Sequence, residues 1–323
     1  MTTTQDMTTT TQDMMITTQD RHRHSPMNGA AKKHDNLSVP EQDPYFYISR
    51  DSADTVDCIH RLSQRKPINV LISGKQGCGK SSFVRQYAAL YRQPLATFQI
   101  GILSEPGQLF GEYALEGGQT TYRQFLFPQA IQTPNCVIHL EEINRPEHPK
   151  ALNMLLSLLS DDRQVWLEEL GNIQVADGVV FFATLNEGDE FVGTEQLDLA
   201  LRDRFYYLLM DYLPNEVEQE VLTRKTGISQ EQAQEIIRAL NYLRGHAELR
   251  LDVSTRTALM IAEMLAVGAT LRRALSVSLQ VSPEALESVL IGLHFKQGHT
   301  ENVINEYVRF DRSFLVKESG RAR

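Results

Sequence analysis

The stretch "INVLISGKQGCGKSSF", residues 68–83, runs from a buried-strand pattern through a glycine-rich loop into the start of a helix. Within it, Gly74, Gly79, Lys80 and Ser81 have the spacing G-x-x-x-x-G-K-S. Glycines let such a loop curl until its backbone N–H groups point inward, and the helix N-terminus that follows adds positive potential. The stretch therefore predicts a loop that binds the phosphates of a nucleoside triphosphate.

The residues expected to bind the nucleotide in this loop are Gly74, Lys75, Gln76, Gly77, Cys78, Gly79, Lys80, Ser81 and Ser82. Among them, Lys80 is expected to bridge the outer phosphates and Ser81 to hold Mg²⁺. We therefore expect ATP and Mg²⁺ as the cofactors. Cys78 stands at a variable position of the loop, where a bystander is favoured over a redox switch.

A second apolar run, "CVIHLEE" (136–142), ends in two adjacent glutamates. We expect its strand to lie next to the strand of the phosphate loop. Glu141 would then serve the metal, and Glu142 would polarise the water that attacks the γ-phosphate. His139 shares a strand face with Glu141, and we interpret it as a core histidine rather than a catalytic group.

The rest of the first two thirds of the chain alternates short β-rich runs with helical segments, which predicts an α/β fold with a parallel sheet and flanking helices. Near-continuous apolar runs, typical of buried strands, occupy 68–73, 95–100, 136–141, 178–185 and 205–210. Helical spacing is found over 81–93 and 150–159. Residues 164–175 predict a hairpin that turns at Gly171–Asn172.

After Leu213–Pro214 the strand signal disappears and helix signals take over. Ser229 with Gln232 makes a capping box, and Ser282 followed by Pro283 marks another helix start. We therefore predict four parts along the chain. They are a disordered Thr/Gln/Asp-rich tail (1–43), an α/β nucleotide-binding domain (44–212), a small all-helical lid domain (213–312) and a C-terminal tail (313–323).

Composition excludes several classes of function. The 41 acidic and 32 basic residues give a formal charge of -9, which argues against a chain-wide surface for nucleic acid. The three cysteines have no paired metal spacing, which indicates a reducing compartment without disulfides. No apolar run approaches the roughly 18 residues of a membrane span, and we expect a cytoplasmic protein.

Five motifs together carry a family resemblance. They are the phosphate loop, "LEEINR" (140–145), "FFATLNEGDEF" (181–191), "LDLALRDRF" (197–205) and "VSTRTAL" (253–259). Their order and spacing resemble those of AAA+ ATPases. The residues within the motifs are most similar to those of the MoxR-type branch with its CbbQ and NorQ groups. The resemblance covers about residues 44–310 and implies an AAA+ core followed by a helical lid.

The resemblance also implies roles for single residues. Asn186 matches sensor 1, which helps to position the attacking water. Arg204 matches the arginine finger, which acts on the γ-phosphate held by the neighbouring subunit, with Arg202 as an alternative or second finger. Arg256 matches sensor 2, which reaches from the lid to the nucleotide.

Two further features are read through the same resemblance. Asn144 and Arg145 match a signature that follows the acids and that implies a subunit-contact or coupling role. Residues 101–131 fit an insert that lines or caps a central pore in such proteins. Their glycines and aromatics by themselves indicate a loop-rich hairpin region, and both a mobile loop and a substrate-gripping loop remain open.

Position 141 departs from the family, which usually has aspartate there. Mg²⁺ demands tight octahedral geometry, and one extra methylene moves the carboxylate by roughly 1.5 Å. A water molecule that bridges the carboxylate and the metal would tolerate this displacement. Because Glu142, Lys80 and Ser81 are all present, hydrolysis is favoured over a binding-only site.

The function that follows is a ring-forming ATP hydrolase that remodels or activates a partner protein. A finger supplied by a neighbour implies a homo-oligomer, and we expect a hexameric ring. Relatives of this kind act as chaperones on a protein client together with a von Willebrand factor A-domain adaptor. The alternatives are a nucleic-acid-linked motor, which the acidic charge disfavours, and an ATP-binding scaffold with little hydrolysis, which Glu141 motivates.

Overall fold

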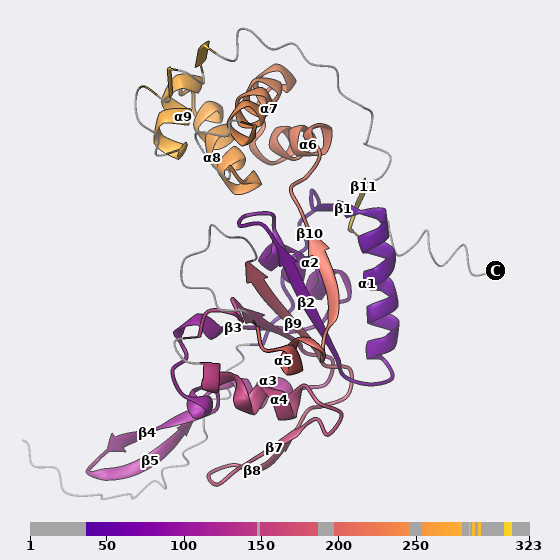
Figure 1. The fold of residues 1–323 in the computed structure, drawn as a ribbon, viewed down its shortest axis with the longest axis vertical. Coiled ribbons are helices and arrows are strands. Elements are labelled where there is room, and N and C mark those ends of the chain that lie inside the picture. The colour runs from indigo at the N-terminus through magenta and orange to yellow at the C-terminus, as the bar shows by residue number, and fades with distance from the viewer. Residues whose placement is uncertain are drawn as a thin grey trace, which may run out of the picture. The chain divides into compact units, whose positions relative to one another are not determined.

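The computed structural model describes residues 37–146, 149–186, 197–245 and 253–279, together with 284, 286–287, 290–291 and 307–311. Its centre is a five-stranded parallel sheet (Figure 1). In spatial order the strands are β10 (Tyr206–Met210), β2 (Ile68–Gly74), β9 (Val180–Asn186), β6 (Val137–Glu141) and β3 (Leu95–Gln99). The predicted parallel α/β sheet is thereby confirmed, with small shifts at the strand ends.

The order of the strands differs from the expectation in one respect. The acidic strand β6 does not lie next to β2, because β9 pairs with both and separates them. The prediction of adjacency was wrong since both strands are continuous apolar runs, and hydropathy alone does not encode which buried strands are neighbours. The insertion places Asn186, the last residue of β9, directly opposite Gly74.

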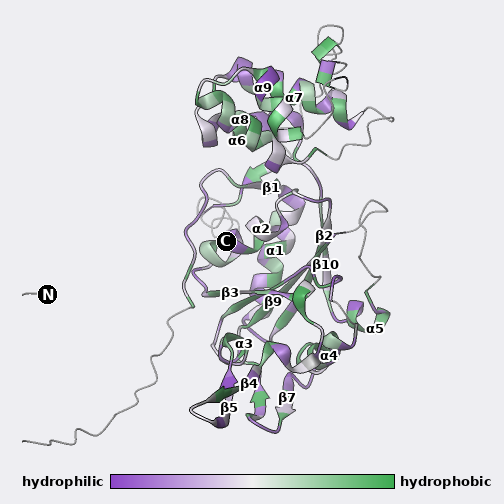
Figure 2. Ribbon diagram, turned by 90° about the vertical axis from the view of Figure 1, so that its left-hand side faces the viewer, coloured by the Kyte–Doolittle hydropathy of each residue, from purple (hydrophilic) through white to green (hydrophobic). Residues whose placement is uncertain are grey.

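Helices cover both faces of the sheet. One face carries α1 (Arg50–Ser63) and α2 (Lys80–Leu90), and the other carries α3 (Leu126–Ile131) and α4 (Asn153–Leu158). The predicted helix 150–159 is divided into two elements. The 3-10 turn Pro149–Leu152 comes first, and α4 follows it. Residues along β2, β9, β6 and β3 alternate between the two cores, and hydrophobic residues recur along the sheet (Figure 2).

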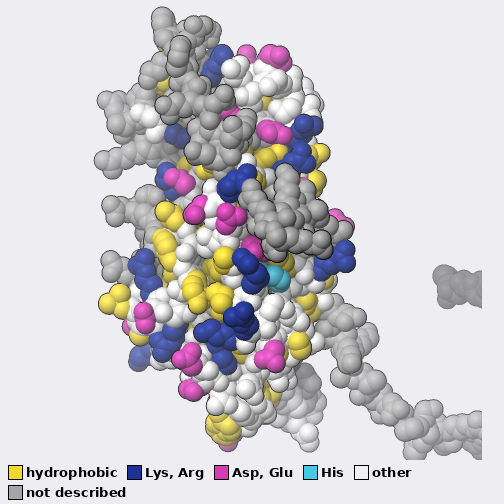
Figure 3. All heavy atoms as spheres, turned by 90° about the vertical axis from the view of Figure 1, so that its right-hand side faces the viewer, with side chains coloured by type: hydrophobic (Ala, Val, Ile, Leu, Met, Phe, Trp, Pro, Cys, Tyr) yellow, Lys and Arg dark blue, Asp and Glu magenta, His cyan; other side chains and the backbone are white. Residues whose placement is uncertain are grey.

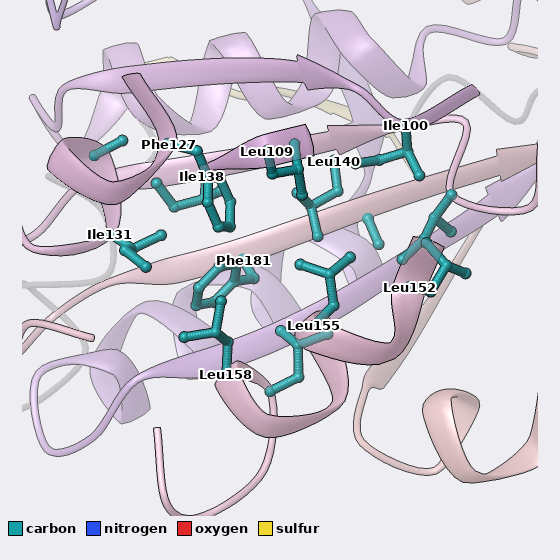
Figure 4. Close-up of a cluster of buried hydrophobic side chains, with 14 of the residues drawn as sticks. Ile100, Leu109, Phe127, Ile131, Ile138, Leu140, Leu152, Leu155, Leu158 and Phe181 are labelled. Atoms are coloured by element: carbon teal, nitrogen blue, oxygen red, sulfur yellow. The ribbon is translucent and has the colours of Figure 1, made fainter. Parts of the chain in front are cut away.

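The core under α3 and α4 combines phenylalanine rings with aliphatic side chains (Figure 4). Phe127 lies edge-on to Phe110, with ring centroids 5.3 Å apart, and Phe181 reaches the same cluster from β9. Leu155 and Leu158 of α4 close it. This packing anchors the segment that follows the two glutamates against the sheet.

Two hairpins lie side by side at the end of the sheet domain (Figure 1). They are β4–β5 (Gly111–Glu116 and Gln119–Gln124) and β7–β8 (Gln164–Leu167 and Gly171–Gln174). The hydroxyl of Tyr113 in the first hairpin donates a hydrogen bond to the carboxylate of Glu169 in the loop of the second, at 2.5 Å.

The predicted turn at Gly171–Asn172 was wrong. Residues 168–170 form the loop, and Gly171 already pairs with Leu167 as the first residue of β8. Gly171 has φ +70, which suits a three-residue loop closed by a left-handed glycine rather than a two-residue turn. The glycine was therefore the correct signal, but it ends the loop instead of forming its tip.

The C-terminal helices form a separate hydrophobic core. They are α6 (Asn215–Thr226), α7 (Gln230–Arg244), α8 (Thr255–Ala266) and α9 (Leu271–Leu279). The capping box of Ser229 and Gln232 at the start of α7 is confirmed. The helix start at Ser282–Pro283 lies outside the described residues. Within the described parts of the chain, no helix is long and apolar enough to cross a membrane.

Both ends of the described chain return to the sheet domain. In the predicted N-terminal tail, residues 1–36 and the repeats they contain lie outside the described residues, as does the predicted C-terminal tail 313–323. Asp43, however, receives a hydrogen bond at its main chain from Gln86 of α2 (2.9 Å), and its own N–H donates to that side chain (2.8 Å). Residues 37–43 therefore belong with the folded domain.

The end of the predicted lid domain also differs from expectation. Residues Tyr307–Arg309 form β11, which pairs antiparallel with β1 (Tyr47–Ser49). Phe310 is fully buried in the α/β core, where its ring stacks on Phe83 with centroids 6.0 Å apart. Gln86 donates to the carbonyl of Phe310 at 2.7 Å. The chain thus leaves the helical core and closes on the first domain.

We predict that Phe310→Ala destabilises the protein by about 3–5 kcal/mol, because a fully buried ring is lost from a packed core. Urea unfolding followed by circular dichroism measures the change. Val277→Ala on α9, at a side chain that is 60% exposed, is the control and should stay within about 0.5 kcal/mol. Equal midpoints for the two variants would contradict the packing of the C-terminal strand.

Candidate nucleotide-binding site

The phosphate loop, residues 74–81, leaves the carboxyl end of β2 and enters α2. Gly74, Gly77 and Gly79 have φ of +154, +71 and +99, a region that L side chains avoid. A Cβ at Gly74 would lie 2.0 Å from the carbonyl oxygen of Met210. The loop therefore has room only for glycine where it passes strand β10.

Lys80 is the buried cation of this loop. Its Nζ donates to the carbonyls of Gly74 (2.7 Å) and Lys75 (2.8 Å), so the ammonium lies inside the curl of the main chain. Burial lowers the pKa of Lys80, while Cys78 and Glu142 act in the opposite direction. The Nζ of Lys75, in contrast, forms an ion pair with the carboxylate of Asp211 at 3.3 Å.

Glu141 and Ser81, the pair predicted to serve the metal, lie in direct contact. One carboxylate oxygen accepts a hydrogen bond from Ser81 Oγ at 2.5 Å, and the other accepts one from the side chain of Gln99. Among the described residues, no group of three or more His, Cys, Asp or Glu could hold a metal. A pair of hard oxygen donors fits Mg²⁺, which takes few protein ligands and keeps phosphate and water oxygens for the rest.

Glu142 adopts a strained backbone conformation with φ +55, which costs of order 1–3 kcal/mol for a residue other than glycine. Thr184 holds it from β9, since its hydroxyl accepts from the N–H of Glu142 (3.4 Å) and its carbonyl accepts from the next N–H (3.0 Å). The Glu142 carboxylate accepts from Asn186 Nδ2 at 3.4 Å and lies 3.6 Å from Arg145. Glu142 lines the same small cavity as Lys80 and Ser81 of the phosphate loop.

The residues behind the two acids are buried and neutral. His139 is 2% exposed, its Nε2 lies 3.3 Å from Thr184 Oγ1, and burial lowers its pKa to about 4. This burial confirms the interpretation of His139 as a core histidine. Asn144 is also buried and donates to the carbonyl of Asn186 at 3.1 Å, which fixes the end of β9.

Two cavities meet over the phosphate loop. The smaller one, about 100 Å³, is lined by Lys80, Ser81, both acids and Asn186, among others. The larger one, about 340 Å³, is lined mainly by β1, the end of β10, α6, α8 and Tyr307 of β11. Gly77, Gly79, Ser82 and Arg256 line both. The polar cavity suits phosphates, and the larger one, with Ile48 and Leu259 in its wall, suits a nucleoside.

The helical region reaches the loop through the start of α8. Arg256, in the first turn of this helix, lines both cavities, and a Cβ at Gly77 would lie 2.5 Å from Ser254, the N-cap residue. Cys78 is buried beside the larger cavity, and burial raises the pKa of its thiol. A raised pKa disfavours the reactive thiolate, which supports the bystander interpretation.

Arg202 and Arg204 lie far from this site. They precede β10, whose Tyr206 pairs with Val70 near the amino end of β2, whereas the phosphate loop begins at the other end of β2. At about 3.3 Å per residue, the length of β2 separates the two ends by roughly 20 Å. Neither arginine lines the cavities over the loop. The guanidinium of Arg202 is exposed and lies over the Tyr207 ring, 5.7 Å from its centroid.

Sequence reasoning missed a link between the loop and the lid. Tyr212 donates to the carbonyl of Gln76 at 3.2 Å, and the charged groups of Lys75 and Arg244 of α7 lie 5.1 Å and 4.8 Å from the centroid of its ring. Arg244 pairs through two hydrogen bonds with the fully buried Glu218. A tyrosine in the linker carries no motif of its own. Glu218 is unusual only because a charged side chain is fully buried there, and burial cannot be read from the sequence.

A phosphate loop, an acid pair at the carboxyl end of β6 in a five-stranded parallel sheet, and a helical region over the nucleotide cavity define a P-loop ATPase of the AAA+ class. Residues 69–205 match the family model described as "AAA domain (dynein-related subfamily)". Residues 218–288 match the model described as "CbbQ/NirQ/NorQ C-terminal". The chain belongs to the CbbQ/NirQ/NorQ family of MoxR-type AAA+ ATPases.

Individual relatives agree with this assignment. A protein of Thauera aromatica named "Putative chaperone BssE" is 66% identical over 85% of this chain and 96% of its own length. "Protein NorQ" of Paracoccus denitrificans is 27% identical over 78% of this chain and 92% of its own. The RuvB Holliday junction branch migration motor of Thermotoga maritima, 15% identical, covers 87% of this chain and 91% of its own with a TM-score of 0.50. That likeness concerns the fold alone.

We predict that Gly77→Ala weakens ATP binding about tenfold, because a Cβ there is strained at φ +71 and collides with Ser254, a cost of about 1–2 kcal/mol. Titration with a fluorescent ATP analogue measures the dissociation constant. Gly107→Ala is the matched control, since no atom lies within 4 Å of its Cβ position. The same affinity in both variants would show that Ser254 does not pack on the loop in solution.

Proposed function

We propose that this chain is an ATP hydrolase that works as a hexameric ring and that uses ATP to remodel or activate a partner protein. The observation that carries the proposal is the placement of Arg204 at the amino edge of the sheet, one strand length from its own phosphate loop. As the arginine finger, Arg204 would act on the nucleotide of a neighbouring copy, because it cannot reach its own.

The chemistry is assigned to the residues at the carboxyl edge. Glu142 is the base that polarises the attacking water, and Asn186, whose Nδ2 lies 3.4 Å from the Glu142 carboxylate, orients that water. Lys80 and Arg256 balance the charge of the phosphates, and Ser81 with Glu141 would hold Mg²⁺. The cation, when bound, neutralises charge on the outer phosphates.

Ring assembly is supported by the surface around the proposed finger. Leu199, Tyr207 and Leu209 are 82%, 47% and 63% exposed, and β10 is an edge strand of the sheet. The face drawn in Figure 3 shows basic side chains lying beside exposed hydrophobic ones. Exposed apolar residues near an edge strand favour contact with another subunit.

A protein client is favoured over nucleic acid. The first relative is named a chaperone, and the net charge of -9 opposes polyanion binding. Tyr113, Leu115 and Trp166 on the two hairpins are exposed and could contact a polypeptide. A von Willebrand factor A-domain adaptor and a cytoplasmic location stay predictions that rest on the family resemblance and on composition.

We expect Glu142→Gln to lower the rate of phosphate release about a hundredfold or more, because general-base catalysis is lost, while ATP binding is retained. Phosphate release from the purified protein measures the rate. Glu112→Gln, an exposed glutamate of β4, is the control that should keep full activity. Equal rates for the Glu142 variant and the unchanged chain would leave only the ATP-binding scaffold.

Arg204→Ala should lower the rate by about 10³, the smaller of the effects known for arginine fingers, and the specific activity of the unchanged chain should rise with protein concentration. Arg202→Ala, tested in parallel, shows whether a second finger contributes. Analytical ultracentrifugation with ATP reports the assembly. A constant specific activity in a protein that stays monomeric would contradict the shared site.

A further inference from the structure

Asn69 is a polar residue buried inside the strand that leads to the phosphate loop. The residue is 2% exposed, and both the nitrogen and the oxygen of its side-chain amide form hydrogen bonds within the protein. Nδ2 donates to the carbonyls of Leu159 and Arg204, each at 2.9 Å, and Oδ1 accepts from Arg163 at 2.5 Å. A buried amide with a complete set of partners fixes those partners in place.

Arg163 holds the amide from the other side. Its guanidinium also donates to the carbonyls of Pro67 (2.9 Å) and Leu158 (3.3 Å). Its backbone has φ +51, a conformation that is costly for arginine and that persists only where surrounding contacts demand it. The two side chains therefore join the start of β2, the end of α4 and the segment before β10.

Asn69 binds the proposed finger residue at its main-chain carbonyl. The N–H of Arg204 is bound as well, to the carbonyl of Leu201 at 3.2 Å. Its guanidinium donates to the carbonyl of Ala200, while Nε is buried without a hydrogen-bond partner. The main chain of residue 204 is thus fixed at both polar atoms, and its side chain has a donor left to satisfy.

We propose that Asn69, held by Arg163, is a positioning residue for the arginine finger and sets the main-chain position from which Arg204 reaches the neighbouring subunit. The inference rests on the proposed function, because it requires that Arg204 act across a subunit boundary. A finger contributes only when its guanidinium lies close to its best position, and a displacement of about 1 Å costs up to about a hundredfold in rate.

The test is a subunit-mixing experiment with Asn69→Asp. This variant keeps the shape of the side chain and the acceptor for Arg163, but it turns an oxygen toward the two carbonyls. We expect a ten- to hundredfold loss in phosphate release, of the order set by finger displacement, with unchanged ATP affinity. Asn172→Asp, at an exposed amide that contacts Gln164, is the matched control and should keep full activity.

Mixing identifies which half of the shared site is damaged. Subunits of the Glu142→Gln variant have an intact finger but no base. In an equimolar ring, roughly a quarter of the interfaces combine the base of an Asn69→Asp subunit with the finger of a Glu142→Gln subunit. Activity should therefore rise above that of either parent. A variant that is merely misfolded, or damaged at its own phosphate loop, gains nothing from mixing.

Arg204→Ala mixed with Glu142→Gln separates the two levels of the proposal. Recovery with Arg204→Ala but not with Asn69→Asp would overturn the positioning role and leave the shared site standing. Failure of both mixtures would overturn the shared site itself, and full activity of Asn69→Asp alone would overturn the positioning role. If Asn69→Asp does not fold, Arg163→Lys takes its place, because it keeps the charge but loses the forked contact with Asn69 and Pro67.

Discussion

The parallel register of β2, β9 and β6 is the constraint on which the site depends. Gly74 pairs with Asn186 across β2 and β9, and Leu140 pairs with Ala183 across β6 and β9. Because all three strands point the same way, the phosphate loop, the polar end of β9 and the two glutamates arrive at one edge of the sheet. Open parallel sheets bind ligands outside this carboxyl edge, and the start of α8 packs against the loop there.

The same parallel direction gives the sheet two chemically different ends. The phosphate-binding groups lie at the carboxyl edge, whereas Arg204 and the amide of Asn69 lie at the amino edge. A rigid sheet cannot bring its own two ends together. In the proposed ring, the separation becomes useful, because each copy offers a nucleotide at one edge and a guanidinium at the other.

Several ordinary rules of folding are broken near the proposed chemistry, and each break has a local counterpart. Glu142 takes a left-handed backbone conformation and is held there by Thr184. Glu141 stands where the family usually has aspartate, yet its longer side chain bonds Ser81 and Gln99 at the same time. Sequences depart from local preference mainly where function requires it.

The sequence by itself determined the five strands of the central sheet, the phosphate loop and the capping box of α7, because each depends on neighbours within a few residues. Hydrophobic runs, glycine spacing and Ser229 with Gln232 are local signals. Only the tertiary structure decided that β9 separates β2 from β6, that Phe310 returns to the first core, and that Asn69 meets Arg163 and Arg204. These contacts join residues far apart in the chain, and a buried apolar or amide side chain does not name its partner until packing brings the two together.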